Sequence, residues 1–256
     1  MSMTRWKLTI EYMGTRYCGW QRQEDGIPSV QQAIEDAISR FCQQDCRLHV
    51  AGRTDAGVHA SGQVAHFDLD YGDRDLDGHG LMRALNAHLR DEAVSIISAE
   101  KVDTEFHARF HATHKLYTYR ILNRTAPPTY DLHQVWHVWG DLDIEAMRRG
   151  ANYLLGHHDF STFRAAECQA KSPFKTLDRL DIDVIPLLAG GQELRFLTEA
   201  KSYLHHQVRN MVGTLMLVGQ GKWVAEDVKE ALEACDRKKG GPTAPPDGLY
   251  LSRVYY

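Results

Sequence analysis

The chain has 256 residues, of which 43% are hydrophobic and 25% charged, and its formal net charge is −4. This is the composition of a globular protein with one large domain or two small ones. No apolar run approaches the ~18 residues that a membrane-spanning helix needs, the N-terminal residues do not form a signal peptide, and the negative charge argues against indiscriminate nucleic-acid binding.

The cysteines are odd in number and scattered along the chain, at Cys18, Cys42, Cys46, Cys168 and Cys235. This pattern is typical of reduced thiols in a cytoplasmic protein. No second cysteine pair completes a zinc site with Cys42 and Cys46. The sequence also lacks a phosphate-binding P-loop, an H-E-x-x-H metal motif and a G-x-S-x-G nucleophile elbow.

The first part of the chain alternates polar and apolar residues, which predicts a half-buried strand containing Trp6, Leu8, Ile10 and Tyr12. Ser29 and Gln32 then fit a capping box, and an apolar stripe predicts a helix that continues to Phe41. Further strands are predicted up to residue 50, over 64–70 and over 93–102, with a short helix over 81–89. The order strand, helix, strand, strand, helix, strand is that of a ferredoxin-like domain.

The most informative stretch is A-G-R-T-D-A-G-V-H-A-S-G-Q-V-A-H-F, at residues 51–67. In an extended backbone, residues two apart point to the same side, so Arg53 and Asp55 are expected to face one cavity among small residues. A neighbouring guanidinium keeps an aspartate ionised. The pattern therefore fits a nucleophile or base, and it also fits an ordinary ion pair that pins a loop.

The second part predicts a strand over 115–122 and a helix striped by Ile144, Met147, Ala151 and Leu154. Residues 157–174 are expected to be irregular. Strands over 177–187 and 193–202, helices over 204–218 and 225–237, and a last strand after a Pro/Gly loop complete the pattern. A boundary near residue 105 divides the chain into halves at 1–105 and 106–256.

A span without acidic residues runs from Phe106 to Tyr130, and its basic side chains include Arg109, Lys115, Arg120 and Arg124. Interleaved tyrosines are typical of a groove that follows a nucleic-acid backbone and stacks bases, although a basic surface strand has the same pattern. Tyr117 and Tyr119 share one strand face. In the helix over 204–218, Arg209 shares a face with His205 and His206.

The 51–67 motif resembles the catalytic motif of the tRNA pseudouridine synthase A family. The likeness extends in order through separate blocks, namely E-Y-M-G-T-R-Y-C-G-W-Q-R-Q at residues 11–23, S-V-Q-Q-A-I at 29–34, F-H-A-R-F-H-A at 106–112, F-S-T-F-R-A-A-E-C-Q-A at 160–170, H-H-Q-V-R-N-M-V-G-T-L at 205–215 and A-P-P-D-G-L-Y-L at 244–251. Several blocks in the same order are far more specific than any one of them.

The resemblance implies the roles of individual residues. Asp55 matches the catalytic aspartate, a nucleophile, and Arg53 its salt-bridging neighbour. Tyr117 matches the tyrosine that contacts the target base, and Arg209 the second arginine near the aspartate. Further substrate contacts are expected at Gly52, Thr54, Gly57, His59, Arg109, Lys115 and Arg164.

The resemblance also implies an α+β fold of two ferredoxin-like half-domains, with antiparallel sheets joined into a central sheet and an active-site cleft between the halves. The first half would carry the catalytic aspartate, and the second the tyrosine and the second arginine. Members isomerise uridine at positions 38, 39 and 40 of the tRNA anticodon stem-loop, without cofactor or metal, as cytoplasmic homodimers that hold tRNA across both subunits.

The chain departs from the family pattern at His111, at His114 and in N-A-H-L-R-D from Asn86 to Asp91, which affects the expected RNA contacts. Two other kinds of protein remain as alternatives. One is a non-catalytic ferredoxin-like module that binds RNA. The other is an RNA deaminase or glycosylase, but a zinc deaminase needs a His/Cys-x-Glu and a Cys-x-x-Cys, which the sequence lacks.

Overall fold

The computed structural model describes residues 3–24, 26–72, 76–188 and 190–256. It contains two compact units, unit 1 with Met1–Thr113 and Tyr250–Tyr256, and unit 2 with His114–Leu249. This division differs from the expected halves, because residues 106–113 and the last strand belong to unit 1. The backbone N–H of Thr113 donates to the Tyr255 carbonyl at 2.9 Å, which ties these two segments together.

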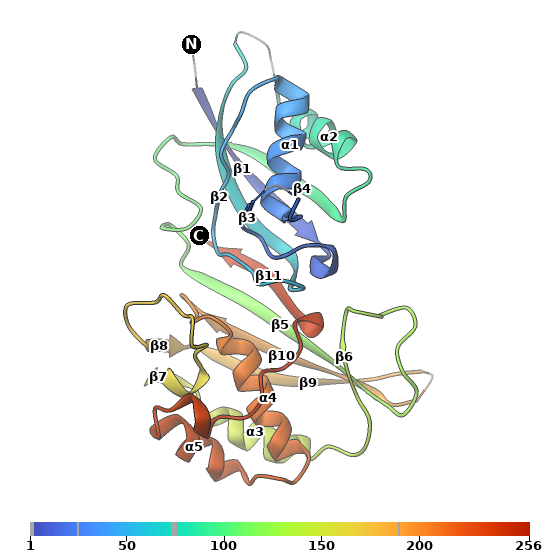
Figure 1. The fold of residues 1–256 in the computed structure, drawn as a ribbon, viewed down its shortest axis with the longest axis vertical. Coiled ribbons are helices and arrows are strands. Elements are labelled where there is room, and N and C mark those ends of the chain that lie inside the picture. Colours follow the sequence, from blue (N-terminus) through green and yellow to red (C-terminus); the bar gives the residue numbers. More distant parts are fainter. Residues whose placement is uncertain (1–2, 25, 73–75, 189) are drawn as a thin grey trace. The chain divides into compact units, whose positions relative to one another are not determined.

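Unit 1 has the predicted order of strands and helices. Its elements are β1 (Met3–Tyr12), α1 (Val30–Cys42), β2 (His49–Val50), β3 (His59–Asp70), α2 (Gly78–His88), β4 (Val94–Val102) and β11 (Leu249–Tyr255). Strand β1 pairs antiparallel with β3 and β4, β2 pairs antiparallel with β3, and β11 adds to β3 in parallel. Figure 1 shows α1 and α2 lying next to each other against this sheet.

Helix α1 begins where the sequence predicts it. The Ser29 side chain accepts a hydrogen bond from the Gln32 backbone N–H at 3.3 Å, which satisfies one of the free donors of the first turn. Gln43 then ends the helix in a left-handed conformation, with φ 57°. The predicted stripe faces the core, since Ile34 and Ile38 are fully buried together with Leu8 of β1.

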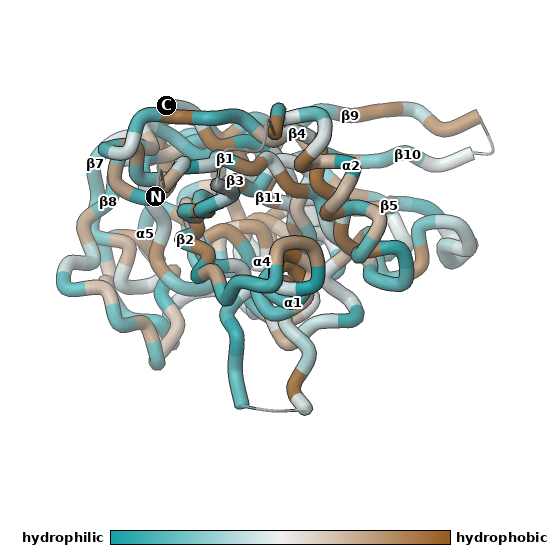
Figure 2. Tube along the Cα trace, turned by 90° about the horizontal axis from the view of Figure 1, so that it is seen from above, coloured by the Kyte–Doolittle hydropathy of each residue, from teal (hydrophilic) through white to brown (hydrophobic). Residues whose placement is uncertain are grey.

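Unit 2 contains β5 (His114–Asn123), β6 (Trp136–Val138), α3 (Ile144–Asn152), β7 (Gly156–Asp159), β8 (Phe174–Leu177), β9 (Arg179–Pro186), β10 (Gln192–Ala200), α4 (Gln207–Gly219) and α5 (Ala225–Glu233). Strand β10 lies between β5 and β9 and is antiparallel to both, and β6 pairs with β5 in parallel. Helices α3, α4 and α5 pack together (Figure 1). Hydrophobic residues continue from β9 into the β9–β10 hairpin, where Leu188 is exposed (Figure 2).

Two regions differ from the sequence expectation. Residues 157–174 contain parts of β7 and β8, which form a separate two-stranded ribbon too short to show alternation. Strand β3 begins at His59 rather than at residue 64. A Cβ on Gly62 would lie 2.3 Å from the Ser252 carbonyl oxygen, so glycine permits the close approach of β11.

The α+β class is confirmed, since both units combine a sheet with packed helices. Among the described residues, every helix is too short or too polar to pass through a lipid bilayer.

Candidate active site

The loop at residues 51–58, which we call the Asp55 loop, connects β2 to β3 in unit 1. The Ala51 N–H donates to the Val64 carbonyl at 2.8 Å, and the Gln63 side-chain amide donates to the Gly52 carbonyl at 2.7 Å. At the other end, the Asp55 carbonyl accepts from the Val58 N–H at 3.2 Å. The loop is therefore tied to β3 and closes with a turn at Asp55.

A second loop, residues 13–20, holds the Asp55 loop from its other side. The Trp20 N–H donates to the Thr54 carbonyl at 3.1 Å, and the Gly57 N–H donates to the Tyr17 carbonyl at 3.4 Å. Gly19 has φ 92°, and a Cβ there would lie 2.9 Å from the Thr54 carbonyl oxygen. Two separate sequence blocks thus form one interlocked backbone structure around Asp55.

Tyr12 supports the Asp55 loop from the core. Its hydroxyl lies 2.7 Å from Thr54 Oγ1 and accepts a longer bond, 3.4 Å, from the Gln63 amide. Burial raises the pKa of Tyr12 to about 12, so the phenol is neutral and able to donate at pH 7. From the sequence, Tyr12 is predicted only as a strand residue. Its position directly before the M-G-T-R segment was the available indication that it lies near the site.

Arg53 and Asp55 lie on either side of Thr54. Arg53 is exposed and Asp55 is half-buried, whereas Thr54, 8% exposed, points into the core. This alternation agrees with the rule that residues two apart share a side, and the turn that closes the loop begins at the Asp55 carbonyl. The ion pair between Arg53 and Asp55 stays a prediction.

The His59 side chain makes structural contacts within unit 1. Its Nδ1 accepts the Gly14 N–H at 3.0 Å, and its buried ring stacks on Tyr250 with 4.7 Å between centroids. A Cβ on Gly14 would lie 2.1 Å from the Val58 carbonyl oxygen, so the two loops touch here as well. The structure therefore gives His59 a clear role in fixing the end of the Asp55 loop.

In unit 2, Tyr117 lies on β5 and is 9% exposed. Its ring meets the Tyr203 ring edge-on at 5.1 Å, and the Tyr203 hydroxyl lies 3.1 Å from Thr198 Oγ1. Burial raises the pKa of Tyr203 well above its ordinary value. A rigid aromatic neighbour thus fixes the orientation of the Tyr117 ring.

Arg209 on α4 is connected to the segment that precedes β11. Its Nε donates to the Ala244 carbonyl at 2.8 Å, and the Ala244 N–H donates back to the Arg209 carbonyl at 3.1 Å. The next residue, Pro245, accepts from the Tyr119 hydroxyl at 2.8 Å. Residues 244–245 therefore link the arginine-bearing helix to the strand that carries Tyr117.

The other residues that were expected to contact the substrate lie in both units. Arg164 donates to the Cys168 carbonyl at 2.8 Å, Lys115 is mostly buried in β5, and Arg109 is exposed in unit 1. Of the two departing histidines, His114 lies 3.5 Å from the Asp178 carboxylate, while the His111 Nδ1 accepts the His107 N–H at 3.4 Å.

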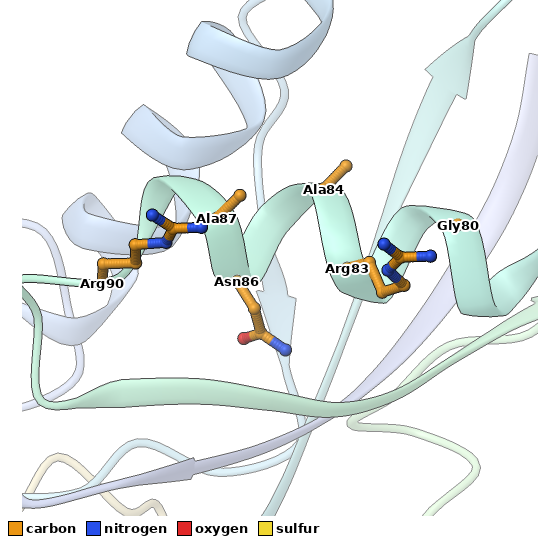
Figure 3. A pocket seen from close by; sticks show the side chains of 6 residues that line it. All are labelled: Gly80, Arg83, Ala84, Asn86, Ala87 and Arg90. Atoms are coloured by element: carbon orange, nitrogen blue, oxygen red, sulfur yellow. The ribbon is translucent and has the colours of Figure 1, made fainter.

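A shallow pocket lies along α2 (Figure 3). It is lined by Gly80, Arg83, Ala84, Asn86, Ala87 and Arg90. Within it, the Asn86 side chain bonds the Ile96 backbone through both its amide nitrogen, at 2.9 Å, and its oxygen, at 2.8 Å. Asn86 thereby holds α2 to β4. The pocket contains no residue of the Asp55 loop.

The tRNA pseudouridine synthase family profile matches residues 8–111 and 151–256. The chain belongs to this family of RNA-modifying isomerases.

Relatives that cover almost the whole chain agree. A protein named tRNA pseudouridine synthase A from Paramagnetospirillum magneticum is 56% identical over 254 residues, which are 99% of this chain and 96% of the relative. Proteins of the same name from Rhodospirillum rubrum and Caulobacter vibrioides are each 53% identical over 99% of this chain, and 88% and 99% of their own lengths are covered.

Proposed function

We propose that this protein converts uridine to pseudouridine at positions 38, 39 and 40 in the anticodon stem-loop of tRNA. The observation that carries the proposal is the Asp55 loop, a half-buried carboxylate on a backbone held from both sides, in a chain that belongs to the pseudouridine synthase family. Catalytic groups need such fixed geometry, because small displacements of a reacting group lower the rate strongly.

The reaction breaks the bond from ribose C1′ to N1 of uracil and forms a bond from C1′ to C5. The proton leaves C5, and N1 gains one. Asp55 serves the sugar side of the reaction, either by attack on C1′ or by removal of a proton from C2′ to give a glycal. The target nucleotide must leave its stack to reach the carboxylate, at a cost of roughly a few kcal/mol.

Tyr117 and Arg209 are proposed to act on the same uridine. The Tyr117 ring is suited to stack on the detached uracil, and its hydroxyl to assist loss of the C5 proton. Its fixed edge-on contact with Tyr203 supports this role. Arg209, whose Nε donates to the Ala244 carbonyl, is proposed as the second arginine that acts on the substrate.

Arg53 is proposed to accompany Asp55 in the site, as the family resemblance implies, and to contact the RNA. It is exposed on the same loop, two residues before the carboxylate. An exposed guanidinium next to a reacting ribose is suited to a phosphate oxygen. Backbone groups of Gly52 and Gly57 and the side chain of Thr54 would line the same site, with Arg109, Lys115 and Arg164 as further RNA contacts and His59 as support.

The enzyme is further proposed to work in the cytoplasm as a homodimer, with no cofactor and no metal. These points rest on the family resemblance. Sedimentation of the purified protein with and without tRNA tests the dimer, and turnover after exhaustive treatment with a chelator tests the absence of a metal requirement.

Asp55→Asn is the decisive test, because it removes the charge and keeps the shape. We expect no tritium release from C5-labelled uridine in tRNA, with tRNA binding largely retained. Glu230→Gln, an exposed acid of α5, is the matched control and should turn over normally. Turnover by Asp55→Asn near the wild-type rate would refute the assignment.

The same assay separates the alternatives. A non-catalytic RNA-binding module binds tRNA and releases no tritium in any variant. A glycosylase releases free uracil, which chromatography detects. Deuterium at ribose C2′ distinguishes the two routes for Asp55, because only the glycal route breaks that C–H bond and slows accordingly.

A further inference from the structure

A series of contacting aromatic rings in unit 1, which we call the column, joins β2 and β3 to the exposed side chain of Phe110. The rings of His49 on β2 and His66 on β3 stack at 5.0 Å, and the His107 ring meets His66 at 4.8 Å. The Phe110 ring lies 4.3 Å from His107 and ends the column. Phe110 is 72% exposed, so its ring face is open to a partner.

The segment that carries Phe110 is held to unit 1 by side chains from distant parts of the chain. Arg5 donates to the carbonyls of Thr104 and Phe106, and it is itself paired with Asp68 at 2.7 Å. Ala108 is bound twice: its N–H donates to His66 Nδ1 at 3.2 Å, and its carbonyl accepts from the Tyr256 hydroxyl at 2.8 Å.

Two histidines of the column, His66 and His107, are uncharged at neutral pH. Burial, together with His107, His49 and Arg5, lowers the pKa of His66 to about 4, and burial with the neighbouring His49 and Arg5 also lowers the pKa of His107. Neutral imidazole rings stack without mutual repulsion. The Ala108 bond to His66 Nδ1 requires the neutral form as well, because a protonated ring has no acceptor.

Positive charge lies beside the exposed end of the column. The Arg109 guanidinium lies 6.0 Å from the centre of the Phe110 ring, and among the described residues Arg109 forms no ion pair. No acidic residue occurs over residues 106–113. An aromatic face next to an unpaired arginine matches a nucleotide, which offers a ring to stack and a phosphate to neutralise.

We propose that Phe110 is a stacking platform for an unpaired base of the tRNA substrate, with Arg109 on the adjacent phosphate. The base would add one more ring to the column His49–His66–His107–Phe110. Because Arg5, His66 and Tyr256 already hold the backbone, binding costs little ordering entropy. This inference rests on the proposed tRNA substrate and adds a contact site outside the Asp55 loop.

The test measures tRNA affinity and turnover for Phe110→Ala and Phe110→Trp. We expect Phe110→Ala to raise the dissociation constant for tRNA by roughly 5- to 100-fold, the range for one base stacked on an aromatic ring. Phe110→Trp should bind as wild type, whereas in Phe110→Ala the KM should change more than kcat. Ile97→Ala, which removes an apolar side chain 47% exposed on β4, is the control and should bind normally.

Arg109→Ala should lower the slope of log affinity against log salt by about 1, as loss of one phosphate contact does. Incorporation of p-benzoylphenylalanine in place of Phe110 should give a light-induced cross-link to an unpaired tRNA nucleotide.

An active wild-type enzyme whose Phe110→Ala variant binds tRNA normally would refute the stacking platform alone. A wild type without tRNA binding or turnover would refute the proposed function itself. If Phe110→Ala instead converts a wild-type dimer into monomers in sedimentation without RNA, the surface contacts a second copy of the chain, and the RNA proposal fails.

Discussion

The bond between Tyr12 and Thr54 predicts a specific coupling between the core of unit 1 and the Asp55 loop. Tyr12→Phe removes the hydroxyl 2.7 Å from Thr54 Oγ1 and leaves that buried oxygen without its partner. An unsatisfied buried polar group costs about 1–3 kcal/mol. Each kcal/mol corresponds to a fall in Tm of roughly 2–4 °C for a domain of this size class.

Turnover should fall further than stability alone explains, because Thr54 is adjacent to Asp55. We expect kcat to decrease about 10-fold with KM little changed, since a misplaced reacting group loses rate steeply. Thr54→Val removes the Thr54 hydroxyl, which is the other partner in the same hydrogen bond. In a double-mutant cycle, the Tyr12→Phe/Thr54→Val variant should be little worse than either single variant, with a coupling energy above ~0.5 kcal/mol.

The assays are urea unfolding for stability and tritium release for kcat. Strict additivity of the two substitutions, or an unchanged kcat in Tyr12→Phe, would refute the reasoning that Tyr12 positions the Asp55 loop. Phe41→Leu, a half-buried change in α1 of the same unit, controls for general loss of packing and should lower Tm without a selective loss of kcat.

Three further substitutions test other parts of the structure. Gly19→Ala forces a side chain into a positive φ and against the Thr54 carbonyl, so stability should fall by about 1–3 kcal/mol with a loss of turnover, and an unchanged Tm would contradict this. Tyr117→Phe should slow tritium release while the circular dichroism spectrum stays native; an unfolded spectrum would make Tyr117 structural. For His66, the folded pKa of about 4 lies below the ordinary 6.5, so the unfolded chain binds more protons between these values and stability should fall as pH falls from 6.5 to 4. His66→Gln should flatten that pH dependence in urea unfolding, and an unchanged slope would show that other groups cause it.

Much of unit 1 could be predicted from the sequence, because its signals are local. Alternation in β1, the Ser29 cap of α1 and the order of elements follow from residues a few positions apart. Unit 2 was predicted less well where strands are short, since β7 and β8 contain four residues each and show no usable period. The block around Asp55 was recognisable because its residues are contiguous in the chain.

The sequence by itself therefore determined the α+β class, the family and the candidate carboxylate at Asp55. Only the tertiary structure placed residues 13–20 against the Asp55 loop, Tyr12 beneath Thr54, and the last strand beside β3. The reason is physical: these contacts join residues tens of positions apart, and such contacts leave no periodic trace in the sequence.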